Sequence, residues 1–144
     1  MRSSRPSGIV LAIVDTGPLY AVADADDDEH RPCLAVLERP DLDLVVPALV
    51  VAEATYLIGR RLGARAEAGF LRGLHVLEVE APSAADWAAI AELVERYADF
   101  PLGGTDASVA VLADRLGTDL IISLDRRHFA VLRSASGGSY RLLP

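Results

Sequence analysis

Four acidic residues stand where they could act together on one ligand: Asp15, Glu53, Asp106 and Asp125. The chain has a single cysteine and no cluster of cysteines or histidines, so a site built from these acids would offer only oxygen atoms. Oxygen ligands favour a hard cation such as Mg²⁺ or Mn²⁺. The natural task of that cation is phosphodiester hydrolysis, because it lowers the pKa of a bound water and neutralises charge that develops on phosphate oxygens.

Asp15 follows a predicted buried strand. The apolar run over residues 9–14 predicts the strand, and Asp15, Thr16 and Gly17 form a turn after it. Pro18 then suits the first position of a helix. Ligands of open α/β sheets bind at the carboxyl ends of the strands, so this pattern places Asp15 at the edge where a ligand would bind.

Asp106 and Asp125 flank a second predicted helix and strand. Thr105 caps the helix and Gly117 ends it, while Leu120–Ile122 form a short apolar run typical of a buried parallel strand. Asp106 reaches the same sheet edge as Asp15 only if its helix begins there. The alternative is that Asp106 is an acid favoured by the helix dipole and that Asp125 is an ordinary turn residue.

Glu53 lies on a helix predicted from Pro47 to Leu62, after a short strand over residues 42–46. The same side of this helix also carries Leu49, Ala52, Tyr56, Leu57 and Arg60. A glutamate in an apolar stripe needs a cation or a hydrogen-bond partner if it is buried. The alternative is a glutamate at the edge of the stripe that reaches solvent. Arg60 lies nearly in line with Glu53 and could contact a phosphate of the ligand.

The remaining segments are predicted to be scaffold. A helix capped by Ser83, with Asp86 completing a capping box, is expected to bury Trp87, Ile90, Ala91 and Val94. Further elements are expected as helices over residues 30–38 and 63–73, a strand over 76–79 and an edge strand over 140–143.

The acidic run over residues 24–29 resembles a calcium-binding loop at first sight. It fails because Glu29 stands where the loop needs glycine and Ala35 where it needs glutamate. A solvated loop is the better interpretation.

Composition narrows the classes of function. All 14 basic residues are arginine, and the absence of lysine excludes a Walker site, a Schiff-base lysine and a phosphorylated receiver domain. The net charge of -7 argues against broad, non-specific binding to nucleic acid. The single cysteine, Cys33, fits a reducing compartment, so we expect a cytoplasmic protein.

The N-terminal region resembles a secretion signal in its arginines, apolar run and small residues at 21–23. The apolar run has only about the minimum length of a signal core, and Asp15 and Pro18 interrupt it before the supposed cleavage site, so we expect neither a secretion signal nor a membrane span. We expect residues 1–8 to form a flexible extension, residues 9–144 to form a single domain, and the protein to make no contact with a membrane.

Four motifs together resemble the PIN domain, in the arrangement of the VapC toxins of bacterial toxin-antitoxin pairs. They read Ile-Val-Asp15-Thr-Gly-Pro-Leu-Tyr, then Val-Val-Ala-Glu53, and finally Pro-Leu-Gly-Gly-Thr-Asp106-Ala-Ser with Ser-Leu-Asp125-Arg-Arg-His-Phe. The resemblance covers nearly the whole chain, and the order of the four acids agrees with the family.

The resemblance implies a three-layer α/β/α sandwich around a mostly parallel sheet. It also implies a homodimer, a small cognate antitoxin as inhibitor, and Mg²⁺- or Mn²⁺-dependent endoribonuclease activity on structured RNA, either transfer or ribosomal RNA. By the same resemblance the four acids would be metal ligands or water-positioning groups, and Thr16 would shape the loop after the first strand. His128 would be a surface or packing residue and not a ligand.

The arginines are the candidates for contact with RNA. Arg60 and Arg126, together with Thr16, are the predicted substrate-binding residues. Arg61 and Arg65 lie with Arg60 at a helix end and the loop after it, and Arg127 follows Arg126; the alternative for these arginines is a scattered solvated surface. Three rival functions stay open: a metal-dependent phosphatase or DNA nuclease with the same carboxylates, a catalytically silent nucleic-acid-binding module, and a phosphoacceptor signalling domain, which the absence of lysine disfavours.

Overall fold

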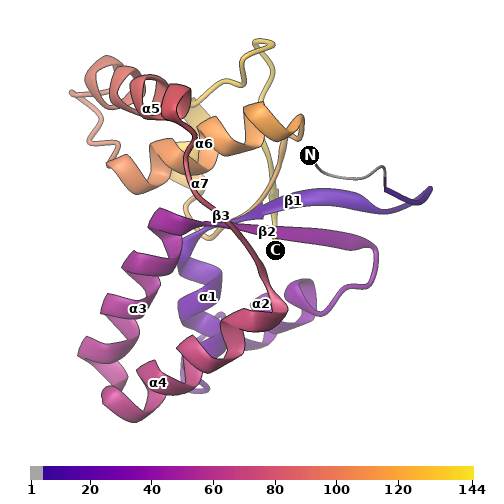
Figure 1. The fold of residues 1–144 in the computed structure, drawn as a ribbon, viewed down its shortest axis with the longest axis vertical. Helices are drawn as coiled ribbons and strands as arrows, with labels where there is room; N and C mark the ends of the chain where they lie inside the picture. Colours follow the sequence, from indigo (N-terminus) through magenta and orange to yellow (C-terminus); the bar gives the residue numbers. More distant parts are fainter. Residues whose placement is uncertain (1–4) are drawn as a thin grey trace.

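The computed structural model describes residues 5–144 and is organised around a five-stranded parallel sheet in the order β3-β2-β1-β4-β5 (Figure 1). Residues 1–4 of the expected N-terminal extension lie outside the described residues. Nε of Arg5 donates to a carboxylate oxygen of Asp43 at 2.8 Å. The strands are β1 Val10–Val14, β2 Leu42–Pro47, β3 Glu78–Glu80, β4 Leu120–Ile122 and β5 Arg141–Leu143.

Helices cover both faces of the sheet, which confirms the predicted α/β class and three-layer sandwich. On one face lie α1 Thr16–Ala23, α2 His30–Leu37, α3 Ala48–Leu62 and α4 Ala64–Gly73, and on the other α5 Ala84–Arg96 and α6 Gly104–Leu116 (Figure 1). A 3₁₀ turn, η1, spans Leu74–Val76, and α7 Arg126–Val131 follows β4.

The core is centred on β1 and β4, the two neighbouring strands at the middle of the sheet. Ile13 pairs with Ile121 and Val14 with Ile122, and all four side chains are fully buried. Parallel strands covered on both faces read as continuous apolar runs, which is why both strands were predictable. Because the two strands end side by side, the residue after Val14 and those after Ile122 meet at one edge of the sheet.

Two helix starts differ from the prediction. α1 begins at Thr16 and not at Pro18, with Asp15 as its N-cap residue. α6 begins at Gly104, and the N-cap is Gly103 and not Thr105. The backbone of Gly103 is extended, which meets the N-cap requirement without a side chain, so Asp106 becomes the third residue of α6. In addition, β3 begins at Glu78, because η1 takes up the residues before it.

The orientation of α3 also differs from the predicted apolar stripe. Val50, Ala54 and Ile58 form the fully buried side of the helix. Glu53 and Tyr56 are exposed. Periodicity alone cannot choose between two adjacent apolar sides of a helix. In this helix the side that packs against the core carries fewer residues than the predicted stripe. Glu53 is therefore the solvent-reaching glutamate of the alternative interpretation.

The predicted buried face of α5 is only partly correct. Ile90 is buried and Val94 is half-buried, but Trp87 is 52% exposed and Ala91 is exposed. This helix lies on the outer side of α6, so a narrow stripe suffices to bury its contact and the rest of the apolar surface faces solvent.

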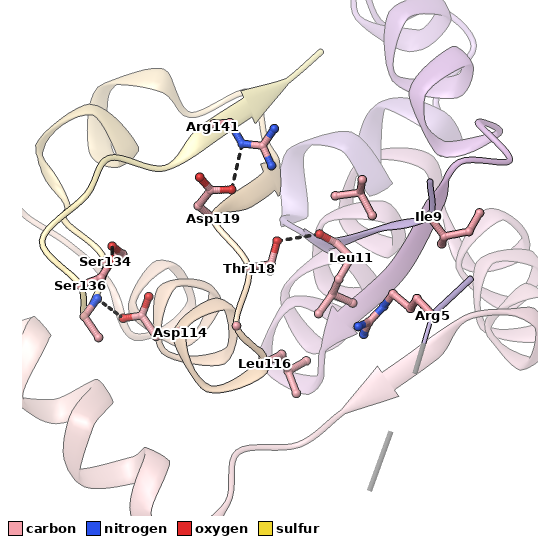
Figure 2. A pocket seen from close by; sticks show the side chains of 13 residues that line it. Arg5, Ile9, Leu11, Asp114, Leu116, Thr118, Asp119, Ser134, Ser136 and Arg141 are labelled. Carbon is pink, nitrogen blue, oxygen red and sulfur yellow. Dashed lines mark hydrogen bonds and ion pairs between the residues drawn. The ribbon is translucent and has the colours of Figure 1, made fainter. Parts of the chain in front are cut away.

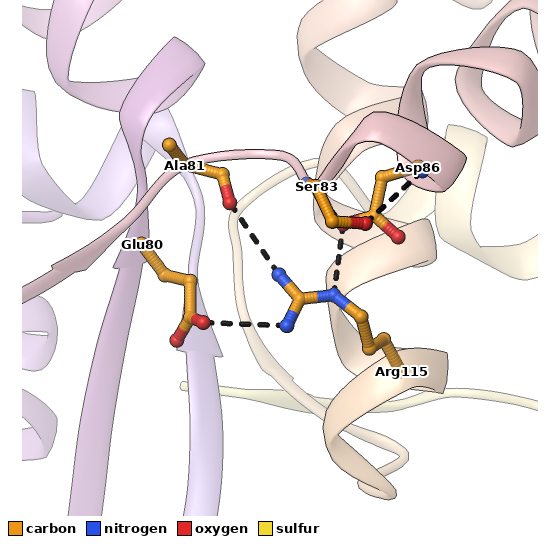
Figure 3. A network of polar contacts seen from close by, with 5 residues as sticks. All are labelled: Glu80, Ala81, Ser83, Asp86 and Arg115. Carbon is orange, nitrogen blue, oxygen red and sulfur yellow. Dashed lines mark hydrogen bonds and ion pairs between the residues drawn. The ribbon is translucent and has the colours of Figure 1, made fainter. Parts of the chain in front are cut away.

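The predicted capping box at the start of α5 is confirmed and is part of a larger polar network (Figure 3). The Asp86 carboxylate accepts from the Ser83 backbone N–H at 2.9 Å and from Nε of Arg115 at 2.8 Å. The Arg115 guanidinium also reaches Glu80 and the Ala81 carbonyl. Burial alone would raise the pKa of Asp86, but these hydrogen bonds outweigh it, and the pKa lies below its ordinary value.

We therefore predict that Arg115→Met lowers the free energy of unfolding by about 2 kcal/mol at pH 7, because the buried Asp86 carboxylate loses a charged partner. Urea denaturation measures this. The control is Arg96→Met, which breaks the exposed Arg96–Glu92 pair and should cost less than about 1 kcal/mol. Equal losses in both variants would contradict a structural role for the Arg115 network. Because the folded pKa of Asp86 is depressed, this difference should shrink as the pH falls below about 4.

Candidate functional site

The four predicted acids line one open cavity of about 370 Å³ at the carboxyl ends of β1 and β4. The lining residues are Asp15, Thr16, Gly17, Glu53, Leu57, Asp106, Leu124 and Asp125. Each acid comes from a different element: the end of β1, the exposed side of α3, the first turn of α6 and the turn after β4. The convergence expected from the sequence is therefore present, while the roles of the acids as metal ligands stay predictions.

Asp15 is the most deeply placed acid and is only 4% exposed. Ser123 donates its hydroxyl proton to Asp15 Oδ2 at 2.7 Å. Burial raises the pKa of Asp15, and the charges of Asp125 and Glu53 raise it further, although the hydrogen bonds from Ser123 and Thr16 act in the opposite direction. The ionised form is thus disfavoured, and a cation beside it would relieve that cost.

Asp106 faces Asp15 and Asp125 from the first turn of α6. Burial, together with the charges of Asp15 and Asp125, raises the pKa of Asp106 to about 6, and the nearby His128 partly offsets these effects. A raised pKa caused by burial and by neighbouring carboxylates is characteristic of acids that share a ligand.

Ser123 connects two of the acids and was missed by the sequence analysis. Its side chain is fully buried, and its hydroxyl accepts a hydrogen bond from the Asp125 backbone N–H at 2.9 Å while donating to Asp15. One hydroxyl thus fixes the Asp15 carboxylate and the turn that carries Asp125. The signal was a serine between a buried apolar strand and an acid, where a polar side chain needs a partner.

His128 contacts Asp125 and packs against Phe100, so it lies beside the acid cavity, and the expectation that it is not a ligand stays a prediction. Its Nδ1 lies 2.6 Å from Asp125 Oδ2, and its Nε2 lies 3.1 Å from the Pro101 carbonyl oxygen. Donor atoms of Asp106, Asp125 and His128 all lie within 4.8 Å of one another, close enough for one metal ion. Both ring nitrogens already face protein acceptors.

The donor set fits a divalent cation. Four carboxylates line the cavity, and the Thr16 hydroxyl oxygen is buried without a hydrogen-bond partner among residues 5–144. A buried hydroxyl normally has a partner, so this one has capacity for a bound water or a ligand oxygen. The residues that could hold a cation are the four acids, with Thr16 beside them.

The predicted substrate-binding arginines lie outside the cavity lining. Arg60 is exposed on α3. Arg126 donates from Nη2 to the Pro144 carbonyl at 2.7 Å. Arg61 and Arg127 stack on aromatic rings, with the Arg61 guanidinium carbon 5.0 Å from the ring centre of Tyr20. The structure therefore does not bring the arginines into the acid cavity, and their contact with a substrate stays a prediction.

A second cavity of about 630 Å³ lies at the opposite edge of the sheet, beside the starts of β1, β4 and β5 (Figure 2). Its charged groups already have partners: Arg141 pairs with Asp119, Arg5 pairs with Asp43, and the Asp114 carboxylate accepts from the Tyr140 hydroxyl at 2.8 Å and from the Ala135 backbone N–H at 3.1 Å. Thr118 donates to the Leu11 carbonyl at 2.7 Å. The cavity thus offers paired polar groups and no acid cluster, so the chemistry belongs to the first cavity.

Comparison with known families identifies the family of this chain. The model of the PIN domain matches residues 12–133. The chain belongs to the PIN domain family. Ribonuclease VapC26 of Mycobacterium tuberculosis is 39% identical to this PIN domain over 134 residues, which cover 92% of this chain and 99% of the relative. The predicted resemblance to PIN domains of the VapC type is confirmed.

Solved structures show the same fold. The crystal structure of Mycobacterium tuberculosis VapC20, described as a sarcin-ricin loop cleaving toxin, has a TM-score of 0.76 at 21% identity and covers 92% of this chain and 99% of that one. The structure of VapBC2 from Rickettsia felis, bound to a promoter DNA fragment, has a TM-score of 0.68 at 14% identity and covers 93% of this chain and 99% of that one. The structure of FitAcB from Neisseria gonorrhoeae has a TM-score of 0.64 at 15% identity and covers 92% of this chain and 96% of that one.

Within residues 5–144, no helix is both long enough and apolar enough to cross a membrane.

Proposed function

We propose that this PIN domain is a divalent-metal-dependent endoribonuclease that acts as the toxin of a toxin-antitoxin pair. The observation that carries the proposal is the convergence of four carboxylates from four elements on one cavity. Burial and mutual repulsion raise the pKa of Asp15 and Asp106, which is costly for a purely structural cluster. The 39% identity to a ribonuclease supports RNA as the substrate.

Asp15, Glu53, Asp106 and Asp125 would hold Mg²⁺ or Mn²⁺, since an all-oxygen donor set suits either ion. The bound cation would supply a water of lowered pKa and would offset charge on the phosphate oxygens. The protein's own part is to fix the acids: Ser123 orients Asp15, and the first turn of α6 presents Asp106. Thr16 has a free acceptor and donor for a water or a phosphate oxygen at the same place.

We propose a structured RNA, either a transfer or a ribosomal RNA, as the substrate. The net charge of -7 opposes broad binding of RNA, so recognition has to come from a local group of arginine side chains. Arg60 shares α3 with Glu53, and Arg126 directly follows Asp125, which makes these arginines the first candidates.

We also propose a protein antitoxin as partner and a homodimer as the assembly. An apolar groove of about 450 Å³ runs between α1, α4 and η1 and gives an apolar segment of an antitoxin a surface to bury. The exposed apolar side chains Tyr56 and Trp87 supply further surface for association. Light scattering of the purified protein measures the assembly: a mass of one chain would contradict the homodimer.

The test of the proposed function is a substrate panel. Purified protein is incubated with total RNA, with double- and single-stranded DNA, and with a chromogenic phosphomonoester, each in Mg²⁺ and in EDTA. We expect cleavage of RNA alone, at discrete positions, and only with Mg²⁺. Cleavage of DNA or of the monoester at a comparable rate would favour the rival nuclease or phosphatase, and no cleavage of any substrate would favour the silent binding module.

Arg60→Ala gives a separate prediction for RNA binding. If Arg60 contacts a phosphate, its loss should weaken binding about equally for all RNA sequences and reduce the slope of log K against log[salt] by about 0.7 to 0.9. Binding of a labelled RNA at several salt concentrations, with Asp106→Asn protein to prevent cleavage, measures the slope. Arg96→Ala on α5 is the matched control, because this arginine is exposed and pairs with Glu92. If both variants show the same slope, Arg60 is a solvated surface residue that does not contact RNA.

A further inference from the structure

His128 contacts two segments of the chain that carry acids of the cavity. The residue lies on α7, directly after the Asp125 turn, and its Nδ1 is 2.6 Å from Asp125 Oδ2. Its Nε2 is 3.1 Å from the carbonyl oxygen of Pro101, in the segment that leads into α6. The ring also packs edge-on against Phe100, with ring centres 4.9 Å apart. His128 therefore bridges the element that carries Asp125 and the segment that delivers Asp106.

Asp125 needs such a contact to hold a single orientation. Its Oδ1 accepts from the His128 backbone N–H at 3.1 Å, as expected of an N-cap residue. That bond fixes one oxygen and leaves the carboxylate free to turn about it. The imidazole fixes the second oxygen, and the two bonds together set the plane of the carboxylate that faces the cavity. A side chain in a half-exposed turn would otherwise sample several rotamers.

We propose that His128 is a positioning residue of the acid cavity, which holds the Asp125 carboxylate in its working orientation through Nδ1. This inference rests on the proposed nuclease function. Both ring nitrogens face oxygen acceptors of the protein, the Asp125 carboxylate and the Pro101 carbonyl, so neither is directed at a ligand in the cavity. His128 thus acts through Asp125 and does not itself contact the phosphate or the cation.

Three substitutions separate the two contacts of the ring nitrogens. His128→Asn keeps an amide N–H near the place of Nδ1, His128→Gln keeps one near the place of Nε2, and His128→Ala keeps neither. We expect His128→Ala to lower kcat by about 10- to 100-fold, the range for partners that orient a site ligand, with KM within about twofold of wild type. His128→Asn should recover most of the loss, and His128→Gln should not.

The matched control is His75→Ala, because His75 is an exposed histidine whose Nδ1 lies 2.7 Å from the Arg72 carbonyl, away from the acid cavity. Its kcat should equal that of wild type. The proposal is overturned if His128→Ala keeps the wild-type kcat, if His128→Gln restores activity as well as His128→Asn, or if the loss lies in KM alone. Should His128→Ala fail to fold, the comparison of the Asn and Gln variants still decides the matter.

A double-mutant cycle distinguishes positioning from direct action. If His128 works through Asp125, then adding His128→Ala to Asp125→Asn should cause no further loss of kcat. The same fold loss in both backgrounds would mean that His128 acts on the substrate or the cation directly, and would overturn the proposal.

Nitrogen-15 spectra of the imidazole give a readout that does not depend on activity. The proton on Nδ1, bonded to a carboxylate, should give a downfield proton signal in the nitrogen-15-labelled wild-type protein, and this signal should move upfield in Asp125→Asn, whose amide oxygen is a weaker acceptor. A wild-type protein that shows the signal but cleaves no RNA would refute the proposed function and leave the His128–Asp125 contact standing. A spectrum without the signal would refute the contact itself.

Discussion

Asp106→Asn should abolish the growth arrest that we expect when the wild-type chain is expressed in a bacterial host without a partner. The substitution removes a charge but almost no volume, so the fold should persist while the cavity loses one of its four carboxylates. Removing even a partner that only orients a metal ligand costs about 10- to 100-fold in activity, and loss of a ligand itself should cost at least as much. Growth curves after induction measure the effect.

Asp119→Asn is the matched control for this experiment. Asp119 pairs with Arg141 beside the second cavity, at the opposite edge of the sheet, and its loss should leave the growth arrest intact. Growth arrest by a folded Asp106→Asn protein would contradict the proposed role of the acid cavity, and so would relief of the arrest by Asp119→Asn.

The same substitution should stabilise the protein when no metal is present. The pKa of Asp106 is raised to about 6 by burial and by Asp15 and Asp125, so holding this carboxylate ionised at pH 7 costs folding free energy. One pKa unit corresponds to about 1.4 kcal/mol, and because Asp106 is partly open to solvent we expect a net gain of about 1 to 2 kcal/mol for Asp106→Asn in EDTA. Thermal unfolding should show a rise of roughly 3 to 6 °C.

The gain should depend on pH in a defined direction. A carboxyl whose folded pKa is raised leaves stability unaffected below its unfolded pKa of about 4, and lowers stability progressively as the pH rises to its folded pKa. The advantage of Asp106→Asn should therefore grow between about pH 4 and pH 6 and stay constant above that. An advantage that is constant from pH 3 to pH 8 would contradict the electrostatic origin.

Added Mg²⁺ should reverse the order of the two proteins. A ligand at about 100 times its dissociation constant stabilises a folded protein by roughly 2.7 kcal/mol, and the wild-type chain should gain this amount. Asp106→Asn should gain less, because one ligand is missing. If the variant is less stable than wild type in EDTA and gains as much from Mg²⁺, then Asp106 is a structural residue of the helix start and not part of a metal site.

Much of the fold was predictable because its central elements have unambiguous patterns. β1 and β4 are continuous apolar runs, each bounded by turn residues; Asp15 follows β1 directly, and Asp125 follows β4 after Ser123 and Leu124. The order of strands does not follow from such patterns, since β1 pairs with β4 across more than a hundred residues. The sequence pattern does predict that strand ends meet at one edge of the sheet, and this was enough to predict that Asp15, Asp106 and Asp125 lie together.

The errors arose where short-range patterns leave two choices. On α3 two neighbouring sides carry apolar residues, and only packing selects Val50, Ala54 and Ile58 as the buried side and directs Glu53 outward to the cavity. On α5 the exposure of Trp87 depends on how little of the helix α6 covers.

Contacts between side chains were the least predictable part of the site. Ser123 is joined to Asp15, 108 positions away in the sequence, and His128 reaches the Pro101 carbonyl 27 positions away. Residue type at one position does not reveal a partner at another, so neither contact follows from a single sequence.

The most direct test of the central claim is the rate of RNA cleavage at saturating Mg²⁺ by four single variants: Asp15→Asn, Glu53→Gln, Asp106→Asn and Asp125→Asn. If the four acids form one metal-dependent centre, each variant should cleave at least about 100-fold more slowly than wild type, while the Asp119→Asn control keeps the wild-type rate. Wild-type rates in the folded Asp15→Asn and Asp106→Asn proteins would show that the acid cavity is not where this PIN domain cleaves RNA.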